Sequence, residues 1–348
     1  AAMQYPDEVS EPAPYQNYWD ESDCWMITYA TTVRDERSSG LTSLQSFCNQ
    51  HLAGAINGLH RLPFYPYSAD DGFADIDYYD VNEDAGTWDD IRSLAGRYRL
   101  MADLVINHVS SQSEWFQNYI SRKDPGKDYF KEAPPEEDLS MVVRPRSTPL
   151  RTEVETVDGN RWVWCTFGPD QVDLDFANPE VLLEFVKIVR HYIDNGIRVL
   201  RLDAVAFLWK EVGTSCLHDQ RTHEIIKLFR TLIEFLDPSI MLITETNVPN
   251  RDNLTYFGNS NEAHAIYNFS LPPLLIHPLL TGTCRHQTTW KMSMPPARGG
   301  TTYFNFLASH DGIGMRPADG LLSEAEKFDQ LDTLRGFGGK VSLRTGPD

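Results

Sequence analysis

Basic side chains, cysteine and long apolar runs are all scarce in this sequence. Lys and Arg number 31 against 50 Asp and Glu, which gives a net charge of −19. That charge repels nucleic acid and anionic membranes, so we expect neither as a partner. The five cysteines form no Cys-x-x-Cys pair, which argues against a disulfide framework or a cysteine metal site and favours a reducing compartment. No apolar run could span a bilayer and segment 1–10 has no signal-peptide core, so a cytoplasmic location is expected.

The sequence does contain a series of short apolar segments that end in polar or ionisable residues. The most informative of them are 103–108, 201–205, 242–247 and 308–312. Stretches with helical periodicity separate these segments along the chain. Strands that alternate with helices and end in ionisable residues predict an α/β protein, a parallel TIM-type barrel with its active site at the carboxyl ends of the strands.

The pattern predicts seven barrel strands and no eighth. The predicted strands are 24–29, 58–64, 100–107, 198–202, 240–244, 265–269 and 303–307. A closed (β/α)8 barrel needs eight strands, so we expect a barrel of this type that lacks the eighth. A short helix is predicted over 323–334.

The helix signals and one long interruption divide the chain. Thr87 and Asn178 are predicted helix caps, with Pro179 at the first helical position. Between them, residues 110–171 are rich in Pro and charge and contain a hairpin signal at Asp158-Gly159. We predict an inserted subdomain over the barrel mouth at 110–171, between barrel portions 1–109 and 172–348.

The residues at the strand ends suit glycoside chemistry. Retaining cleavage requires an ionised carboxylate that attacks the anomeric carbon and a protonated one that feeds the leaving oxygen, about 5 Å apart. Asp203, with Arg201 two residues before it, fits the attacking role, and Glu245 fits the acid/base role. Asp311 is expected to bind two adjacent sugar hydroxyls, and His108 and His310 to form hydrogen bonds with sugar hydroxyls as neutral side chains.

Each of these residues also has a purely structural interpretation. A single Asp at a strand end is more often a helix cap or turn former than a nucleophile. Asp103 is expected to be of this kind, buried and accepting backbone hydrogen bonds, and Asp173 to Phe176 could be a turn before the Asn178 cap. The joint, ordered occurrence of the carboxylates at strand ends favours catalysis.

These segments resemble the conserved regions of the α-amylase family of retaining glucoside-active enzymes. Residues 103–108 resemble its first region, 201–204 its nucleophile region, Glu245 its acid/base region, and His310-Asp311 the region of its transition-state aspartate. The resemblance extends from about Trp25 to the end of the chain. It implies a TIM-type catalytic barrel in which Asp203, Glu245 and Asp311 are catalytic.

Within the family, the resemblance is to the sucrose-phosphorylase branch. It rests on segments 69–73, 144–146, 210–216, 271–275 and 310–314. It implies that Asp70 binds outer hydroxyls of the glucosyl ring, that Phe73 packs on its apolar edge and that Gln171 lines the site. Arg146 is the implied phosphate contact, with a solvated loop residue as the equally weighted alternative.

The sequence departs from sucrose phosphorylases at two positions. Asn247 stands where they typically carry His and Phe207 where they carry Tyr, so the run from 244 to 249 is more similar to that of glucosylglycerate phosphorylases. This implies a substrate-binding Asn247 and a glycerate or small-polyol leaving group rather than fructose. The expected partners are an α-glucoside and inorganic phosphate, the expected product is α-glucose 1-phosphate, and no cofactor or metal is expected. An α-glucoside hydrolase or transglucosidase, or an inactive relative that acts as a binding domain, remains the alternative.

Overall fold

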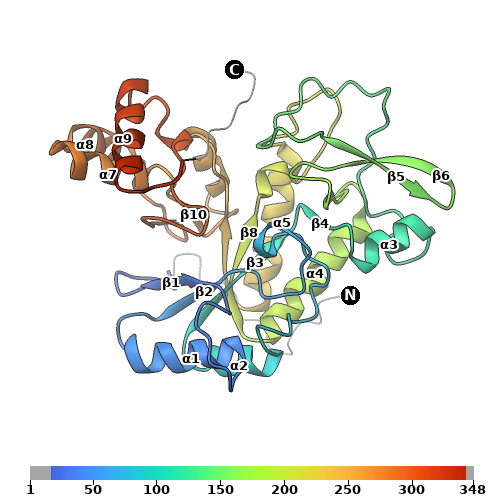
Figure 1. The fold of residues 1–348 in the computed structure, drawn as a ribbon, viewed down its shortest axis with the longest axis horizontal. Helices are drawn as coiled ribbons and strands as arrows, with labels where there is room; N and C mark the ends of the chain where they lie inside the picture. Colours follow the sequence, from blue (N-terminus) through green and yellow to red (C-terminus); the bar gives the residue numbers. More distant parts are fainter. Residues whose placement is uncertain (1–16, 342–348) are drawn as a thin grey trace.

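The computed structural model describes residues 17–341, and its centre is a curled sheet of seven parallel strands (Figure 1). The sheet order is β1-β2-β3-β8-β9-β10-β11. The bounds are β1 Trp25–Thr28, β2 Gly58–Arg61, β3 Arg99–Val105, β8 Ile197–Asp203, β9 Met241–Thr244, β10 Ala265–Tyr267 and β11 Thr302–Phe304. All seven predicted strands are confirmed, and no eighth strand joins this sheet within residues 17–341. The fold is therefore of the predicted (β/α)8 barrel type, one strand short. Segment 1–10, to which the signal-peptide prediction refers, lies outside the described residues.

Helices between the strands cover the outside of the sheet. They are α1 Gly40–His51, α2 Trp88–Ala95, α4 Pro179–Asp194 and α5 Gln220–Leu236. The predicted caps are confirmed: Thr87 and Asp90 form a capping box at α2, and Asn178 accepts from Glu180 N at the start of α4. These caps satisfy backbone donors that have no partner inside the helix, so each helix starts where its strand-to-helix loop ends.

The main core lies between the sheet and these helices. Strands β3 and β8 are buried almost throughout, as expected for parallel strands covered on both faces. Phe185 and Ile188 on α4 and Phe229 on α5 are among the fully buried side chains that pack against them. This packing fixes where each strand ends along the barrel axis, and so it positions the polar residues that follow each strand.

The inserted segment, residues 110–171, separates β3 from β8 in sequence although these strands are neighbours in the sheet. Around it lie β4 His108–Ser110 and β7 Gln171–Asp173, which pair antiparallel, and within it α3 Glu114–Ser121 and the hairpin of β5 Arg151–Thr156 and β6 Gly159–Trp164. The hairpin predicted at Asp158-Gly159 is confirmed, and Gly159 has a φ of 105° that suits glycine. The division of the chain into three parts at 110 and 171 stays a prediction.

Three further helices gather on the β10 side of the molecule, away from the β5–β6 hairpin (Figure 1). They are α7 Leu271–Thr281, α8 Arg285–Ser293 and α9 Glu324–Gly336, and α9 confirms the helix predicted near the carboxyl end. Shorter turns are α6 Asn250–Asn253, η1 Asp70–Gly72, η2 Val205–Phe207, η3 Leu254–Phe257 and η4 Arg316–Ala318. Within residues 17–341, no helix is both long and apolar enough to cross a membrane.

Candidate active site

A buried ionic network lies at the carboxyl ends of β2, β3 and β8. Asp103 on β3 lies opposite Arg201 on β8 in the strand register. Arg201 Nη1 donates to Asp103 Oδ1 at 2.6 Å and to Asp203 Oδ1 at 2.8 Å. His60 Nε2 lies 3.0 Å from Asp103 Oδ2. Asp103 is buried as expected, but the expectation of backbone partners for its carboxylate is wrong, because a guanidinium and an imidazole hold it.

The two carboxylates of this network differ in charge balance. Burial acts to raise the pKa of Asp103, but His60 and Arg201 outweigh it and lower the pKa to about 2. At Asp203, burial raises the pKa and Arg201 opposes that rise. Asp103 is therefore a permanent anion that keeps Arg201 in place, and Arg201 in turn favours the ionised form of Asp203.

Glu245 lies beside Asp203 at the end of the neighbouring strand. Leu202 on β8 is in register with Thr244 on β9, so Asp203 and Glu245 follow at equivalent points. Glu245 Oε2 accepts from the backbone N of Ala204 at 3.2 Å. Ala204 has a φ of 49°, a left-handed conformation that costs a non-glycine residue on the order of 1 kcal/mol. This strained turn points the backbone N–H of Ala204, the residue after Asp203, toward the Glu245 carboxylate.

Glu245 has the pKa of a group that can carry a proton near neutrality. Burial raises its pKa to about 7; Arg201 opposes the rise, while Asp203 and Asp311 add to it. Arg201 bonds Asp203 directly and so favours its ionised form, whereas Glu245 receives only a backbone N–H. This difference in surroundings is the one that retaining glycoside cleavage requires, where one carboxyl is ionised and the other carries a proton.

Aromatic rings form one wall of the site. The Phe73 ring stacks on His310, with centroids 5.1 Å apart and planes 9° apart. Tyr29 meets His310 edge-on at 6.5 Å. The Arg201 guanidinium lies 5.8 Å from the Phe73 ring and 5.5 Å from the Tyr267 ring. Phe73 and His310, both predicted site residues, are thereby brought to the ionic network although more than half the chain separates them.

Gln171 connects three predicted sugar-binding residues. Its Nε2 donates to Asp70 Oδ2 at 2.9 Å and to the backbone oxygen of Phe73 at 3.0 Å. His108 Nε2 lies 2.8 Å from the same backbone oxygen, an acceptor, so this nitrogen carries the ring proton. Asp70, Phe73, His108 and Gln171 therefore form one hydrogen-bonded group although they come from three separate parts of the chain.

Arg146 extends from the inserted segment to this group. Its Nη2 lies 3.7 Å from Asp70 Oδ2, and both side chains are partly exposed. The contact places a cation at the predicted sugar site rather than in an unrelated loop. An exposed pair at this distance is weak, so Arg146 is free to exchange Asp70 for an anionic ligand at little cost.

Comparisons with known proteins agree with this geometry. The sequence model for the alpha amylase catalytic domain matches residues 55–311. This chain belongs to the alpha-amylase family. The match spans every predicted catalytic residue from Asp203 to Asp311. The solved structure of sucrose 6F-phosphate phosphorylase from Thermoanaerobacter thermosaccharolyticum superposes with a TM-score of 0.83 at 25% identity, covering 93% of this chain and 67% of that one.

Named relatives of this alpha-amylase family chain are phosphorylases. Glucosylglycerate phosphorylase of Spirochaeta thermophila is 43% identical over 97% of this chain and 58% of its own length. That of Escherichia coli is 44% identical over 96% of this chain and 60% of its own length. Sucrose phosphorylase of Agrobacterium vitis is 30% identical over 92% of this chain and 67% of its own length. The chain thus spans about 60% of the length of the glucosylglycerate phosphorylases that it matches.

Two predicted residues lie at the open side of this alpha-amylase family site. The Asp311 side chain is 72% exposed and pairs with its neighbour His310 at 3.4 Å. Its charge nevertheless contributes to the raised pKa of Glu245. Asn247 is exposed and its side-chain amide packs against Gly314, at 3.2 Å from where a Cβ would stand. The loops after β9 and β11 therefore meet beside Glu245. The roles assigned to all these residues stay predictions.

Several residues at the site were not singled out from the sequence. His60, Tyr29 and Tyr267 surround the ionic network, and burial, ahead of Asp71 and Asp311, raises the pKa of Tyr29 to about 12. His60 and Tyr267 lie within or at the end of predicted strands, so the rule that strand ends carry function could have included them. The cluster that the described residues offer for a metal ion lies elsewhere, on α7, α8 and α9.

Proposed function

We propose that this chain carries the glucosyl-transfer site of an α-glucoside phosphorylase. The supporting observation is the pair formed by Asp203, bonded to Arg201, and Glu245, whose pKa is raised to about 7. The named relatives add the reaction class, because they act as phosphorylases of glucosylglycerate or sucrose. The activity, the substrates and the partners of the whole protein are part of this proposal.

The reaction proceeds by double displacement. An Asp203 carboxylate oxygen attacks the anomeric carbon and breaks its bond to the aglycone oxygen, which takes the proton of Glu245. The product of this step is a β-glucosyl ester on Asp203. An oxygen of inorganic phosphate then attacks the same carbon, Glu245 takes the proton from phosphate, and Asp203 leaves. The two inversions give α-glucose 1-phosphate with net retention.

The residues around this pair hold the glucosyl ring and the phosphate. Asp70 and His108 bind ring hydroxyls; Gln171 donates to Asp70, and Gln171 and His108 both donate to the backbone oxygen of Phe73. Phe73 packs on the apolar edge of the ring, and Asp311 binds hydroxyls once a sugar occupies the site. Arg146 supplies the local positive charge that phosphate needs against a net charge of −19.

The aglycone is glycerate or a related small polyol. Asn247, two residues after Glu245 and next to Gly314, contacts the leaving group in this proposal. Phe207 meets Phe167 edge-on at 5.5 Å, which makes that wall of the site apolar where a Tyr hydroxyl would hydrogen-bond to a larger aglycone. Both features favour the substrate named for the glucosylglycerate phosphorylases over sucrose.

The deciding experiment runs the reaction in reverse. The chain is incubated with α-glucose 1-phosphate and one of four acceptors: glycerate, glycerol, fructose or fructose 6-phosphate. Phosphate release that depends on glycerate supports the proposal. Asp203→Ala serves as the control and should lower the rate by on the order of 10⁴-fold or more. Phosphate release by Asp203→Ala at the parent rate would contradict the nucleophile assignment.

The hydrolase alternative gives a different product from the same intermediate. If water rather than phosphate resolves the glucosyl ester, α-glucose 1-phosphate yields glucose and phosphate in equal amounts without any acceptor. Release that is independent of acceptor would therefore replace the phosphorylase proposal with an α-glucoside hydrolase on the same scaffold. Arg146→Ala separates the two further, because it should weaken phosphate binding without affecting hydrolysis of an α-glucoside whose leaving group carries no phosphate.

A further inference from the structure

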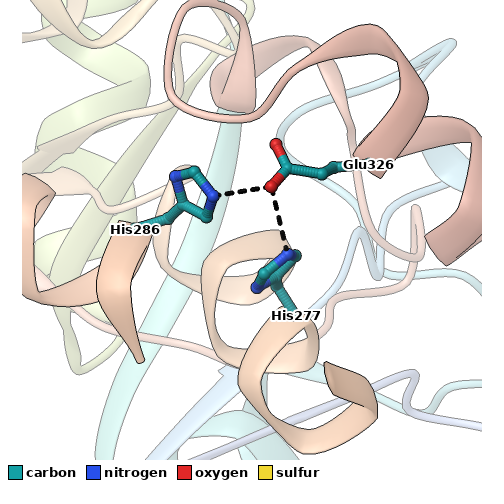
Figure 2. Close-up of side chains that lie close together, drawn as sticks. All are labelled: His277, His286 and Glu326. Carbon is teal, nitrogen blue, oxygen red and sulfur yellow. Dashed lines mark hydrogen bonds and ion pairs between the residues drawn. The ribbon is translucent and has the colours of Figure 1, made fainter. Parts of the chain in front are cut away.

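A second cluster of polar side chains lies outside the glucosyl site, where α7, α8 and α9 meet. Figure 2 shows His277 from α7, His286 from α8 and Glu326 from α9 pointing toward one another. Their potential ligand atoms all lie within 4.8 Å of one another. His277 is buried, and the other two are partly exposed, so an ion in solution can reach the cluster.

We propose that His277, His286 and Glu326 bind a divalent first-row transition ion, with Zn²⁺ as the probe of choice. Two imidazoles and one carboxylate form a donor set that such ions favour, and three protein ligands leave a coordination position for water. The ion would add a shared bond to three helices that side-chain packing and a few hydrogen bonds already hold together.

The carboxylate is oriented for this role by its own helix. Glu326 Oε2 accepts from Ser323 N at 2.9 Å and from Ser323 Oγ at 2.7 Å, as part of the capping box at the start of α9. These bonds fix the side chain and leave Oε1 facing the histidines. Hydrogen bonds from Ser323, and then from His286, lower the pKa of Glu326 to about 2, so the carboxylate is ionised at neutral pH.

His277 is oriented by a neighbour in the same way. Thr281 Oγ1 donates to the backbone oxygen of His277 at 2.8 Å and lies 3.4 Å from His277 Nδ1. Because the Thr281 hydroxyl proton is used in the bond to the His277 carbonyl, Oγ1 can only accept from His277 Nδ1–H. The ring proton of His277 is then on Nδ1, and Nε2 keeps a free lone pair. That Nε2 is 3.9 Å from Glu326 Oε1, too far for a hydrogen bond, so it faces the cluster as a ready ligand.

The two distances from the histidines to Glu326 lie on either side of the spacing that an ion requires. Ligand bonds of about 2.0–2.2 Å in a tetrahedral site place ligand atoms roughly 3.4 Å apart. The His286 Nε2 to Glu326 Oε1 distance of 2.7 Å is below that value, and the His277 Nε2 distance of 3.9 Å is above it. An ion that binds His286 Nε2 replaces its hydrogen bond to Glu326, and the neutral imidazole then carries its proton on Nδ1.

The surrounding contacts already hold the helices near the required geometry. Gln330, one turn beyond Glu326 on α9, donates to the backbone oxygen of Pro273, one turn before His277 on α7. Ser270 at the start of α7 donates to Pro317 O in the segment that follows the His310–Asp311 loop. A bound ion would therefore stiffen the helices that flank this loop of the glucosyl site.

Zn²⁺ titration of the chain tests the proposal directly. The chain is purified without a polyhistidine tag, freed of metal with a chelator, and titrated with Zn²⁺ by calorimetry and against a chromophoric chelator. We expect one ion per chain. His286→Ala and Glu326→Gln should each weaken binding by at least the ~10- to 100-fold typical of groups that merely orient metal ligands. Glu326→Gln keeps a side chain able to cap α9, so the fold survives the change.

His51→Ala is the matched control, because it removes an exposed histidine from the end of a different helix, α1. It should bind Zn²⁺ as the parent does. Co²⁺ bound to the parent should give visible absorption bands that are lost in His286→Ala. The proposal would be overturned if His286→Ala and His51→Ala had the same effect on Zn²⁺ binding. It would also be overturned if the parent showed no saturable binding. Glucosyl transfer plays no part in these readouts, so the outcome is independent of the proposed function.

Discussion

At the residue scale, the decisive feature is which carboxyl holds the proton. Glu245 has a pKa raised to about 7, chiefly by burial, so it is protonated below pH 7 and loses the proton above it. Formation of the glucosyl ester needs that proton for a poor leaving group. The single-turnover rate should therefore fall as the pH rises through about 7. For an activated leaving group such as fluoride, the rate should stay flat.

Glu245→Gln provides the check on this assignment. It should lower the single-turnover rate for the poor leaving group by about 10²- to 10⁴-fold and remove the fall above pH 7. The rate with α-glucosyl fluoride should change little. Equal losses on both substrates would show that Glu245 acts in binding or folding rather than as the acid.

Asp75 is a second unusual carboxyl. It is fully buried, and neither oxygen has a hydrogen-bond partner among the described residues. Burial, and then the charges of Asp203 and Asp103, raise its pKa well above the usual value of 3.8. When the pKa of an acid is higher in the folded state than in the unfolded state, the protein loses stability as the pH rises between the two values. The loss is up to ~1.4 kcal/mol of unfolding free energy per pH unit.

Asp75→Asn should remove that loss. Its free energy of unfolding, measured by urea denaturation, should match the parent near pH 4 and exceed it increasingly toward pH 8. Glu83→Gln, a change at an exposed carboxyl, should show no such divergence. A constant difference between Asp75→Asn and the parent at all pH values would mean that Asp75 is ionised in the fold.

At the element scale, each helix depends on one buried face. Phe185 on α4 is fully buried, whereas Leu183 on the same helix is 53% exposed. Phe185→Ala should therefore lower the free energy of unfolding by about 3–5 kcal/mol, and Leu183→Ala by less than about 1 kcal/mol. Chemical denaturation of both variants checks this. Similar losses would mean that α4 does not pack against the sheet as described.

The elements were also the most predictable level of the structure. Alternation of apolar runs with helical periodicity located all seven sheet strands, and the caps at Thr87 and Asn178 located two helix starts. The site was less predictable, because the strand pattern locates His60 and Tyr267 but does not say that their side chains face the ionic network. His277, His286 and Glu326 have no motif spacing at all; only the packing of α7, α8 and α9 brings them together. Local patterns therefore predict elements, and tertiary packing decides which side chains meet.

At the scale of the whole molecule, the inserted segment must be fixed to the barrel for Arg146 and Gln171 to reach the site. A buried network at the end of β7 provides this connection. Asp173 accepts from Lys210 Nζ at 2.9 Å, from Asn107 Nδ2 at 3.0 Å and from Thr166 Oγ1 at 2.6 Å. Asn107 follows β3, Lys210 follows η2, and Thr166 belongs to the inserted segment. One carboxylate thus joins three parts of the chain that are distant in sequence.

Removing one charge of this network should lower the free energy of unfolding more than removing both charges. Lys210→Met leaves Asp173 as a buried anion without its cation, which should cost about 3–5 kcal/mol of unfolding free energy. Adding Asp173→Asn to that variant removes the unpaired charge, so the double variant should be more stable than Lys210→Met alone. A double-mutant cycle by urea denaturation measures the coupling, and additive losses would show that the two charges do not interact.

Because the network holds Gln171 two residues away, Lys210→Met should also weaken glucosyl binding more than the exposed substitution Glu83→Gln does.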